Sequence, residues 1–239
     1  MVLVQKAYQD FSDYSRQSYD NWQLLLKKQL VNIEGRATGY FMEGLKSILP
    51  LIQDIPNITV LSDFLYQSIG WQLWPVQGLL EPGIFFYLLS HQYFPVSTVV
   101  RSQTDFTYSP VPDLWHDIFG HIPLLFFPPY SSLIQKTSQN YLDYPKFKSA
   151  IGSLFWYTIE AGVCNEHGDR RVYGASQLSS IEEIGYAVSH HPIVIPFDLG
   201  QVLNSPVQID KLQDYIFEIP SLDYLDSIPN QLDQYLSYQ

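Results

Sequence analysis

The sequence predicts a mostly α-helical fold with a few short strands, arranged as one domain. Several segments carry apolar residues at helical spacing, whereas the alternation typical of a strand is short and rare. The chain has 239 residues, of which 46% are hydrophobic, so it can bury a sizeable core. It shows no internal repeat and no linker rich in glycine and serine. We therefore expect residues 1–19 to form an N-terminal arm and residues 20–239 to form a single domain.

The first hundred residues are expected to contain four helices and one short strand. Asp20 is a good N-cap residue, and it is expected to begin a helix that ends at Gly35. The apolar face of this helix is formed by Trp22, Leu25, Leu26, Leu30 and Ile33. The later elements expected are helices over 38–49, 62–70 and 83–93, and a strand over 96–101.

The second half is also expected to be mainly helical. A helix that begins near Pro112 or Asp113 is expected to end at Gly120, since Pro123 follows shortly after. Further helices are expected over 131–142, 147–164 and 181–188. Ser180 and Glu183 have the spacing of a capping box at the start of the last one. The acidic end of the chain has no long heptad pattern, so we expect a monomer.

Two histidines lie in the short, otherwise apolar stretch PVPDLWHDIFGHIPLL, residues 110–125. His116 and His121 are five residues apart, which is about 140° of rotation on a regular helix, so their rings would not share a face. A helix end at Gly120 would allow His121 to turn back toward His116. Either histidine alone is more often a core residue than a metal ligand. The pair becomes a candidate metal site if a carboxylate joins it.

Glu160 can supply that carboxylate, because it lies in the apolar stretch FWYTIEAGVC. A carboxylate buried there is costly unless it is paired, hydrogen-bonded or bound to a metal. Two histidines and one carboxylate are the ligand set of non-haem Fe(II) sites, although burial beside an arginine is the alternative for Glu160. Arg101 is a candidate for binding a substrate carboxylate through two of its guanidinium N–H groups. The alternative role for Arg101 is an ion pair within the protein, for instance with Asp113.

Composition excludes several classes of partner. The chain has 13 Lys and Arg against 24 Asp and Glu, a net charge of −11, which disfavours nucleic acid and anionic membranes. Cys164 is the single cysteine, so no intrachain disulfide can form. The N-terminus lacks a basic region followed by an apolar run, and no apolar run approaches the roughly 18 residues of a membrane span. We expect a cytoplasmic protein.

Four stretches together resemble the pterin-dependent aromatic amino acid hydroxylases, in particular the bacterial phenylalanine hydroxylases. They are LWPVQGLL, VVRSQTDFTYSPVPDLWHDIFGHIPLL, FWYTIEAG and RRVYGASQLSSIEEIGYAV, in the order of the family and close to its spacing. The likeness covers residues 20–225 and is more specific than two spaced histidines alone. It implies a single catalytic domain of the aromatic amino acid hydroxylase type, acting as a monooxygenase that most resembles those converting L-phenylalanine to L-tyrosine.

The resemblance also implies roles for residues. His116, His121 and Glu160 would hold Fe(II). A tetrahydropterin, either tetrahydrobiopterin or a bacterial analogue, would contact the three residues Leu80, Phe85 and Asp117. The amino acid substrate would contact Arg101, Ser109, Pro112, Trp156 and Ser179, and O2 would be the other substrate. Ser179 also matches a family serine that supports a metal-bound histidine.

Two departures from the animal enzymes bear on the substrate. Ala161 replaces a bulky aromatic residue, and Ser176 replaces the second glycine of a YGAG run. A smaller side chain beside the substrate would leave room for a larger aromatic ring, so tryptophan and tyrosine are alternative substrates. Two other classes stay open: a metal-dependent hydrolase that uses the same ligands around zinc, and a non-catalytic binding protein on the same scaffold.

Overall fold

The computed structural model describes residues 5–100, 112–207 and 212–238. Within these ranges the chain is mainly helical, as predicted. The helices are α1 (Arg16–Asn32), α2 (Gly39–Ile48), α3 (Ile58–Ile69), α4 (Pro82–Ser90), α5 (Ile122–Leu125), α6 (Pro128–Asp143), α7 (Lys148–Phe155), α8 (Ala175–Ser179), α9 (Ile181–Val188), α10 (Leu199–Leu203) and α11 (Ile228–Ser237).

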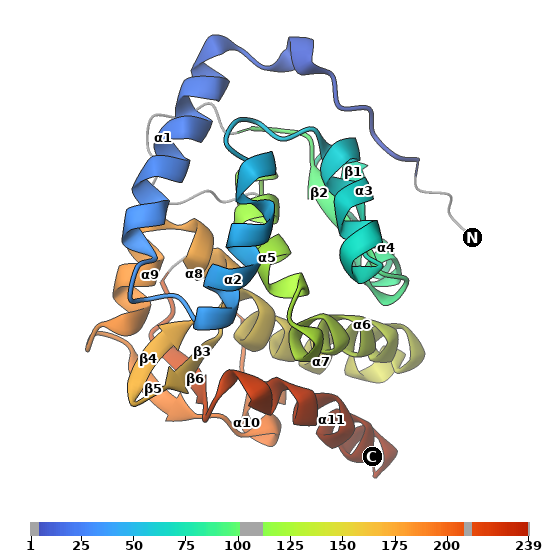
Figure 1. The fold of residues 1–239 in the computed structure, drawn as a ribbon. Helices are drawn as coiled ribbons and strands as arrows, with labels where there is room; N and C mark the ends of the chain where they lie inside the picture. The colour runs from blue at the N-terminus through green and yellow to red at the C-terminus, as the bar shows by residue number, and fades with distance from the viewer. Residues whose placement is uncertain (1–4, 101–111, 208–211, 239) are drawn as a thin grey trace.

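The strands are short and form two small sheets. They are β1 (Gln72–Val76), β2 (Tyr93–Ser97), β3 (Val163–Glu166), β4 (Asp169–Val172), β5 (Ile193–Pro196) and β6 (Tyr215–Ile219). Strands β1 and β2 pair in parallel, and the other sheet has the order β4-β3-β6-β5 with only the β3–β4 pair antiparallel. Figure 1 shows the two sheets at opposite corners of the molecule, with α2 and α5 between them.

Helix starts follow the capping side chains, and two of them differ from the prediction. Helix α1 begins at Arg16 rather than Asp20, because the Ser15 side chain accepts a hydrogen bond from the backbone N–H of Ser18. Helix α3 begins at Ile58 rather than near Ser62, because Asn57 caps it in the same way. The boundary at residue 20 between an arm and the domain stays a prediction.

Two other predicted elements also have different bounds. The expected strand over 96–101 is instead β2, which ends at Ser97. The expected long helix over 147–164 is divided into α7, a π-helical segment named η5 (Trp156–Glu160), and the start of β3. Glu160 therefore lies at the end of a helix, next to a turn into the sheet, rather than in a helix interior.

The core is one continuous cluster of apolar side chains that includes the predicted face of α1. Trp22 is fully buried, its indole packs edge-on against Trp115, and its N–H donates to the carbonyl of Ile52. This contact fixes the stretch that carries the two histidines against the N-terminal helices.

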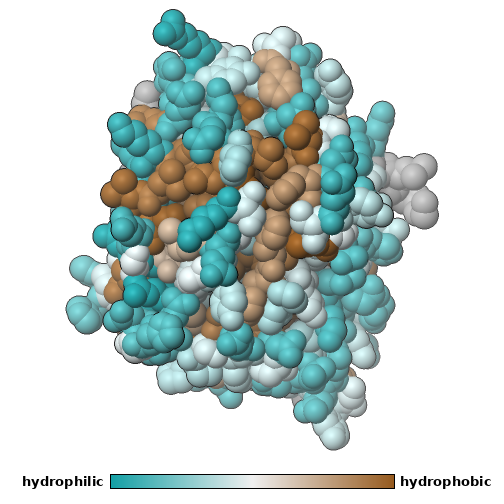
Figure 2. Space-filling view, in the orientation of Figure 1, coloured by the Kyte–Doolittle hydropathy of each residue, from teal (hydrophilic) through white to brown (hydrophobic). Residues whose placement is uncertain are grey.

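The visible face in Figure 2 is a mosaic in which apolar side chains are interrupted by hydrophilic ones. Single exposed apolar side chains are usual on folded proteins, and Val31 and Val60 are examples here. Among the described residues, no helix has both the length and the apolar character that crossing a membrane requires.

Candidate metal centre

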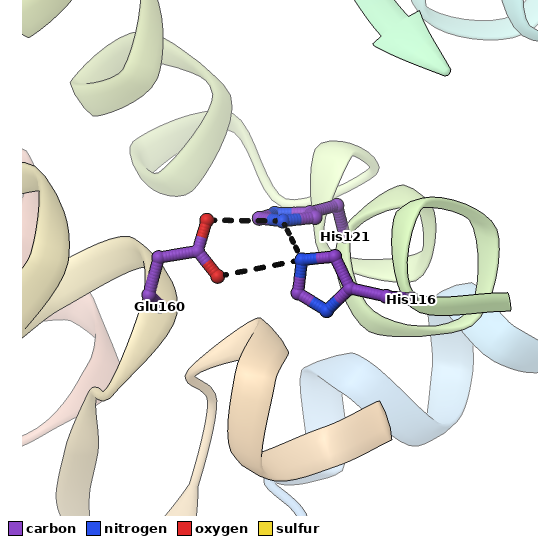
Figure 3. A group of neighbouring side chains, drawn as sticks. All are labelled: His116, His121 and Glu160. Carbon is purple, nitrogen blue, oxygen red and sulfur yellow. Dashed lines mark hydrogen bonds and ion pairs between the residues drawn. The ribbon is translucent and has the colours of Figure 1, made fainter. Parts of the chain in front are cut away.

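His116, His121 and Glu160 converge on one point (Figure 3). The Nε2 atoms of the two histidines are 3.2 Å apart. The Glu160 Oε1 lies 3.3 Å from Nε2 of His121, and Oε2 lies 3.6 Å from Nε2 of His116. His121 is buried, while His116 and Glu160 keep small exposed fractions of 13% and 14%, so the cluster is reachable from one side.

A π-helix brings the two histidines together, rather than the helix end predicted at Gly120. Residues 116–121 form the π-helical segment η3, which continues into α5. Because π-helical hydrogen bonds join residues i and i+5, side chains five residues apart lie about one turn above each other. His116 and His121 therefore share a face within an uninterrupted helix, and Pro123 lies in the first turn of α5 instead of ending a helix.

Gly120 is needed for close packing. A Cβ atom added there would lie 2.7 Å from the carbonyl oxygen of Ala175 in α8. Only glycine lets η3 approach α8 this closely.

Glu160 is placed by the second π-helical segment, η5. The N–H of Ala161 donates to the carbonyl of Trp156, five residues earlier, at 2.8 Å. Two glycines allow the turn that follows, since a Cβ at Gly162 or Gly174 would lie 2.3 Å from neighbouring atoms. Both segments that carry candidate ligands are thus π-helical, a local structure that is rare and often found at functional sites.

The separations between the three side chains fit a metal ion. Ligand atoms about 2.1 Å from one ion are separated by about 3.0 Å in an octahedral site and about 3.4 Å in a tetrahedral one. The observed 3.2–3.6 Å agree with one ion among the three side chains. Two imidazoles and one carboxylate, on one side of an accessible point, are the donor set of non-haem Fe(II) sites.

Ser179 contacts the ring nitrogen of His116 that does not face the cluster. Its hydroxyl donates to the carbonyl of Ser176 at 3.2 Å and lies 2.9 Å from Nδ1 of His116. While the hydroxyl hydrogen is donated to Ser176, Nδ1 is the donor in its contact with Ser179, which leaves the lone pair of Nε2 for the cluster. A metal-binding histidine commonly has such a partner on its other nitrogen.

Burial and neighbouring groups shift the pKa values of two carboxyl groups near the cluster in opposite directions. Burial raises the pKa of Glu160, but His121 and His116 lower it to a value below the ordinary one. Burial raises the pKa of Asp117 well above its ordinary value, although the N–H of Ser97 donates to its carboxyl at 2.7 Å. The two histidines therefore favour the charged form of Glu160, which is the form that binds a metal ion.

Four of the other predicted contact residues, Leu80, Phe85, Pro112 and Trp156, fall within the described part of the chain. Leu80 precedes α4, and Phe85 on α4 packs edge-on against Phe155 at the end of α7. Trp156 lines a cavity of about 800 Å³ beside α7 and α10. Pro112 is exposed, whereas Arg101 and Ser109 lie outside the described residues.

Asp113 caps the helix that was expected to begin near Pro112 or Asp113. Its Oδ1 accepts from the N–H of His116 at 3.1 Å, so the carboxyl group begins the helix that carries both histidines.

Two residues that contact the predicted ligands, Tyr130 and Ser176, were not predicted as part of the centre. The Tyr130 hydroxyl lies 3.4 Å from Nδ1 of His121. Ser176 donates to the carbonyl of Glu160 at 2.8 Å, and its oxygen also lies 3.3 Å from Oε2 of Glu183. Ser180 caps α9 through the N–H of Glu183, as the sequence indicates. No local sequence pattern indicates that Tyr130 lies near the centre. Ser176 could have been noticed, because it departs from the YGAG run of the family.

Glu183 should make the stability of the metal-free protein depend on pH. Burial raises its pKa from 4.5 to about 7, the Ser176 hydroxyl opposes this, and Glu160 and Glu182 add to it. Between these values the folded chain keeps a proton that the unfolded chain releases. The free energy of unfolding should therefore fall as pH rises through this window, by at most roughly 3 kcal/mol.

Urea unfolding of the metal-free protein at several pH values from about 5 to 8 would measure this effect. Glu183→Gln should remove the corresponding part of the pH dependence, and exposed Glu182→Gln should retain it. An unchanged pH profile in Glu183→Gln would contradict the prediction.

Comparisons with known proteins agree with this fold and site. The model of the biopterin-dependent aromatic amino acid hydroxylase family matches residues 11–237. The phenylalanine-4-hydroxylase of Vibrio cholerae is 32% identical over 215 residues, which are 89% of this chain and 74% of the relative. The phenylalanine-4-hydroxylase of Pseudomonas aeruginosa is 32% identical over 216 residues, which are 90% of this chain and 82% of the relative.

Solved structures show the same likeness. The phenylalanine hydroxylase of Chromobacterium violaceum, with bound iron(III) and 7,8-dihydrobiopterin, superposes with a TM-score of 0.88 at 30% identity, covering 97% of this chain and 87% of the other. The structure of the same enzyme with bound Fe(III) superposes with a TM-score of 0.91, covering 97% of this chain and 86% of the other.

A mostly helical fold around two histidines and a carboxylate defines a non-haem iron oxygenase as the class of protein. With the match over residues 11–237, the chain belongs to the biopterin-dependent aromatic amino acid hydroxylase family.

Proposed function

We propose that this chain is an Fe(II)- and tetrahydropterin-dependent monooxygenase that converts L-phenylalanine to L-tyrosine. The observation that carries the proposal is the convergence of His116, His121 and Glu160, with ligand atoms 3.2–3.6 Å apart, in a member of this family. Relatives named phenylalanine-4-hydroxylase support the choice of substrate.

These three side chains would hold the iron. Phe85 would stack on the pterin, backbone groups near Leu80 would contact its polar edge, and Asp117 would face it. Phe85 supports this assignment because it packs against the end of α7, the helix that leads to Glu160. When bound, the iron and the reduced pterin supply the two electrons and the oxygen activation that ring hydroxylation needs.

The remaining assignments concern the amino acid. Arg101 and Ser109 would bind the substrate carboxylate, and Pro112 and Trp156 would border the ring. Ser179 is better suited to orienting His116, because its one hydroxyl hydrogen goes to the carbonyl of Ser176. The apolar side chains around η3 and η5 limit the access of water to the reacting ring.

Product analysis tests the proposal directly. The purified protein would be given Fe(II), O2 and a synthetic tetrahydropterin, with phenylalanine, tyrosine and tryptophan in separate reactions. We expect tyrosine from phenylalanine to form fastest, and only when the pterin is present. Faster formation of hydroxytryptophan would move the substrate to the alternative that the small Ala161 side chain allows.

The same samples separate the other classes. Hydrolytic activity without pterin or O2 would indicate a metal hydrolase, and bound iron without any hydroxylation would contradict the proposed reaction. We also propose that the enzyme acts as a cytoplasmic monomer that requires neither nucleic acid nor membrane. Sedimentation of the purified chain tests its oligomeric state, and a tetramer would contradict the proposal.

A further inference from the structure

We propose that Ser176 is a positioning residue of the metal centre: its hydroxyl holds the backbone of Glu160, and its carbonyl holds the hydroxyl of Ser179, which contacts His116. The inference rests on the proposed metal centre and adds a residue to it. It concerns how the two ligand segments, 44 positions apart between His116 and Glu160, keep a fixed separation.

The first contact of Ser176 is with the carboxylate segment. Its hydroxyl donates to the carbonyl oxygen of Glu160 at 2.8 Å. Glu160 is the last residue of η5, so the residues after it supply no helical N–H for that carbonyl. The serine hydroxyl therefore supplies a partner at the place where the helix ends.

The second contact of Ser176 leads to the histidine segment. Its own carbonyl accepts from the Ser179 hydroxyl at 3.2 Å, and this hydroxyl lies 2.9 Å from Nδ1 of His116. One turn of α8 thus connects a carboxylate ligand with a histidine ligand. Helix α8 also packs closely against η3, since Gly120 leaves no room for a Cβ beside Ala175.

A third contact holds the Ser176 side chain in this orientation. Oε2 of Glu183, on the neighbouring helix α9, lies 3.3 Å from its oxygen. A hydroxyl has one hydrogen, which the contacts with Glu160 at 2.8 Å and with Glu183 at 3.3 Å share, so the shorter contact with the carbonyl of Glu160 dominates.

Metal affinity distinguishes positioning from ordinary packing. The metal-free protein would be titrated with Co(II), which accepts the same nitrogen and oxygen ligands as Fe(II), while its visible absorption is recorded. Ser176→Ala should weaken Co(II) binding by about 10- to 100-fold and change the Co(II) spectrum, as the loss of a supporting contact does at other metal sites. Ser176→Thr keeps the hydroxyl, so it should retain most of the wild-type Co(II) affinity and a Co(II) spectrum close to that of the wild type.

The matched control is Ser62→Ala. The Ser62 hydroxyl is buried and joins two elements, since it accepts from the N–H of Leu73, but it lies on α3 outside the centre. Ser62→Ala should lower the melting temperature about as much as Ser176→Ala does, and it should leave Co(II) binding unchanged. Wild-type affinity and spectrum in Ser176→Ala, or equal loss in both variants, would overturn the inference. A wild-type protein that binds Co(II) but hydroxylates no ring would contradict the proposed function alone.

Discussion

Replacing Glu160 or His121 with alanine should abolish tight metal binding and ring hydroxylation while the fold persists. Each substitution removes one of three ligand atoms that lie 3.2–3.6 Å apart. Removing a contact behind a ligand typically costs 10- to 100-fold in metal affinity, so loss of the ligand itself should exceed about 100-fold. Metal titration and the yield of tyrosine from phenylalanine would measure the two effects.

The fold should survive these changes because the apolar cluster that forms the core contains neither side chain. Glu160→Ala also removes a buried anion, which lowers the desolvation cost of the metal-free state. The matched control is His91→Ala, at an exposed histidine on the C-terminal side of α4. It should bind metal as the wild type does. Full turnover by Glu160→Ala or His121→Ala would show that the substituted residue is not a ligand.

Local sequence patterns predicted the helices that are defined by apolar spacing and caps. The face of α1 and the Ser180 cap of α9 are both present. They could be predicted because their causes lie within a few residues of one another. The start of α1 was wrong because Ser15 and Asp20 are both acceptable caps, and the sequence alone does not rank them.

The candidate site was predicted in its residues but not in its geometry. His116, His121 and Glu160 could be chosen from their chemistry and from the family motifs. The π-helical turns that bring them together depend on contacts between distant segments, such as Gly120 against Ala175. Ser176 contacts Glu160 and Glu183, which lie 16 and 7 positions away in the sequence. This separation is short, but the contacts also require the turn at Gly162 and the close packing at Gly174, which a local sequence pattern does not reveal.

Gly120→Ala should destabilise the protein and weaken its metal site together. The added methyl group would lie 2.7 Å from the carbonyl oxygen of Ala175, a backbone atom that cannot rotate away. Relief requires η3 to move from α8, which would lengthen the contact between His116 and Ser179. Overpacking of this kind costs about 1–3 kcal/mol, so urea unfolding should show a loss in that range and Co(II) titration a weaker site.

Gly152→Ala provides the control, because it makes the same change in α7 where an added Cβ meets no atom within 4 Å. Alanine is favoured over glycine inside a helix by up to about 1 kcal/mol, so this variant should be as stable as the wild type or more so. Equal stability and equal Co(II) affinity in Gly120→Ala and the wild type would mean that η3 tolerates displacement from α8. The close approach at Gly120 would then not determine the separation of the two histidines from Glu160.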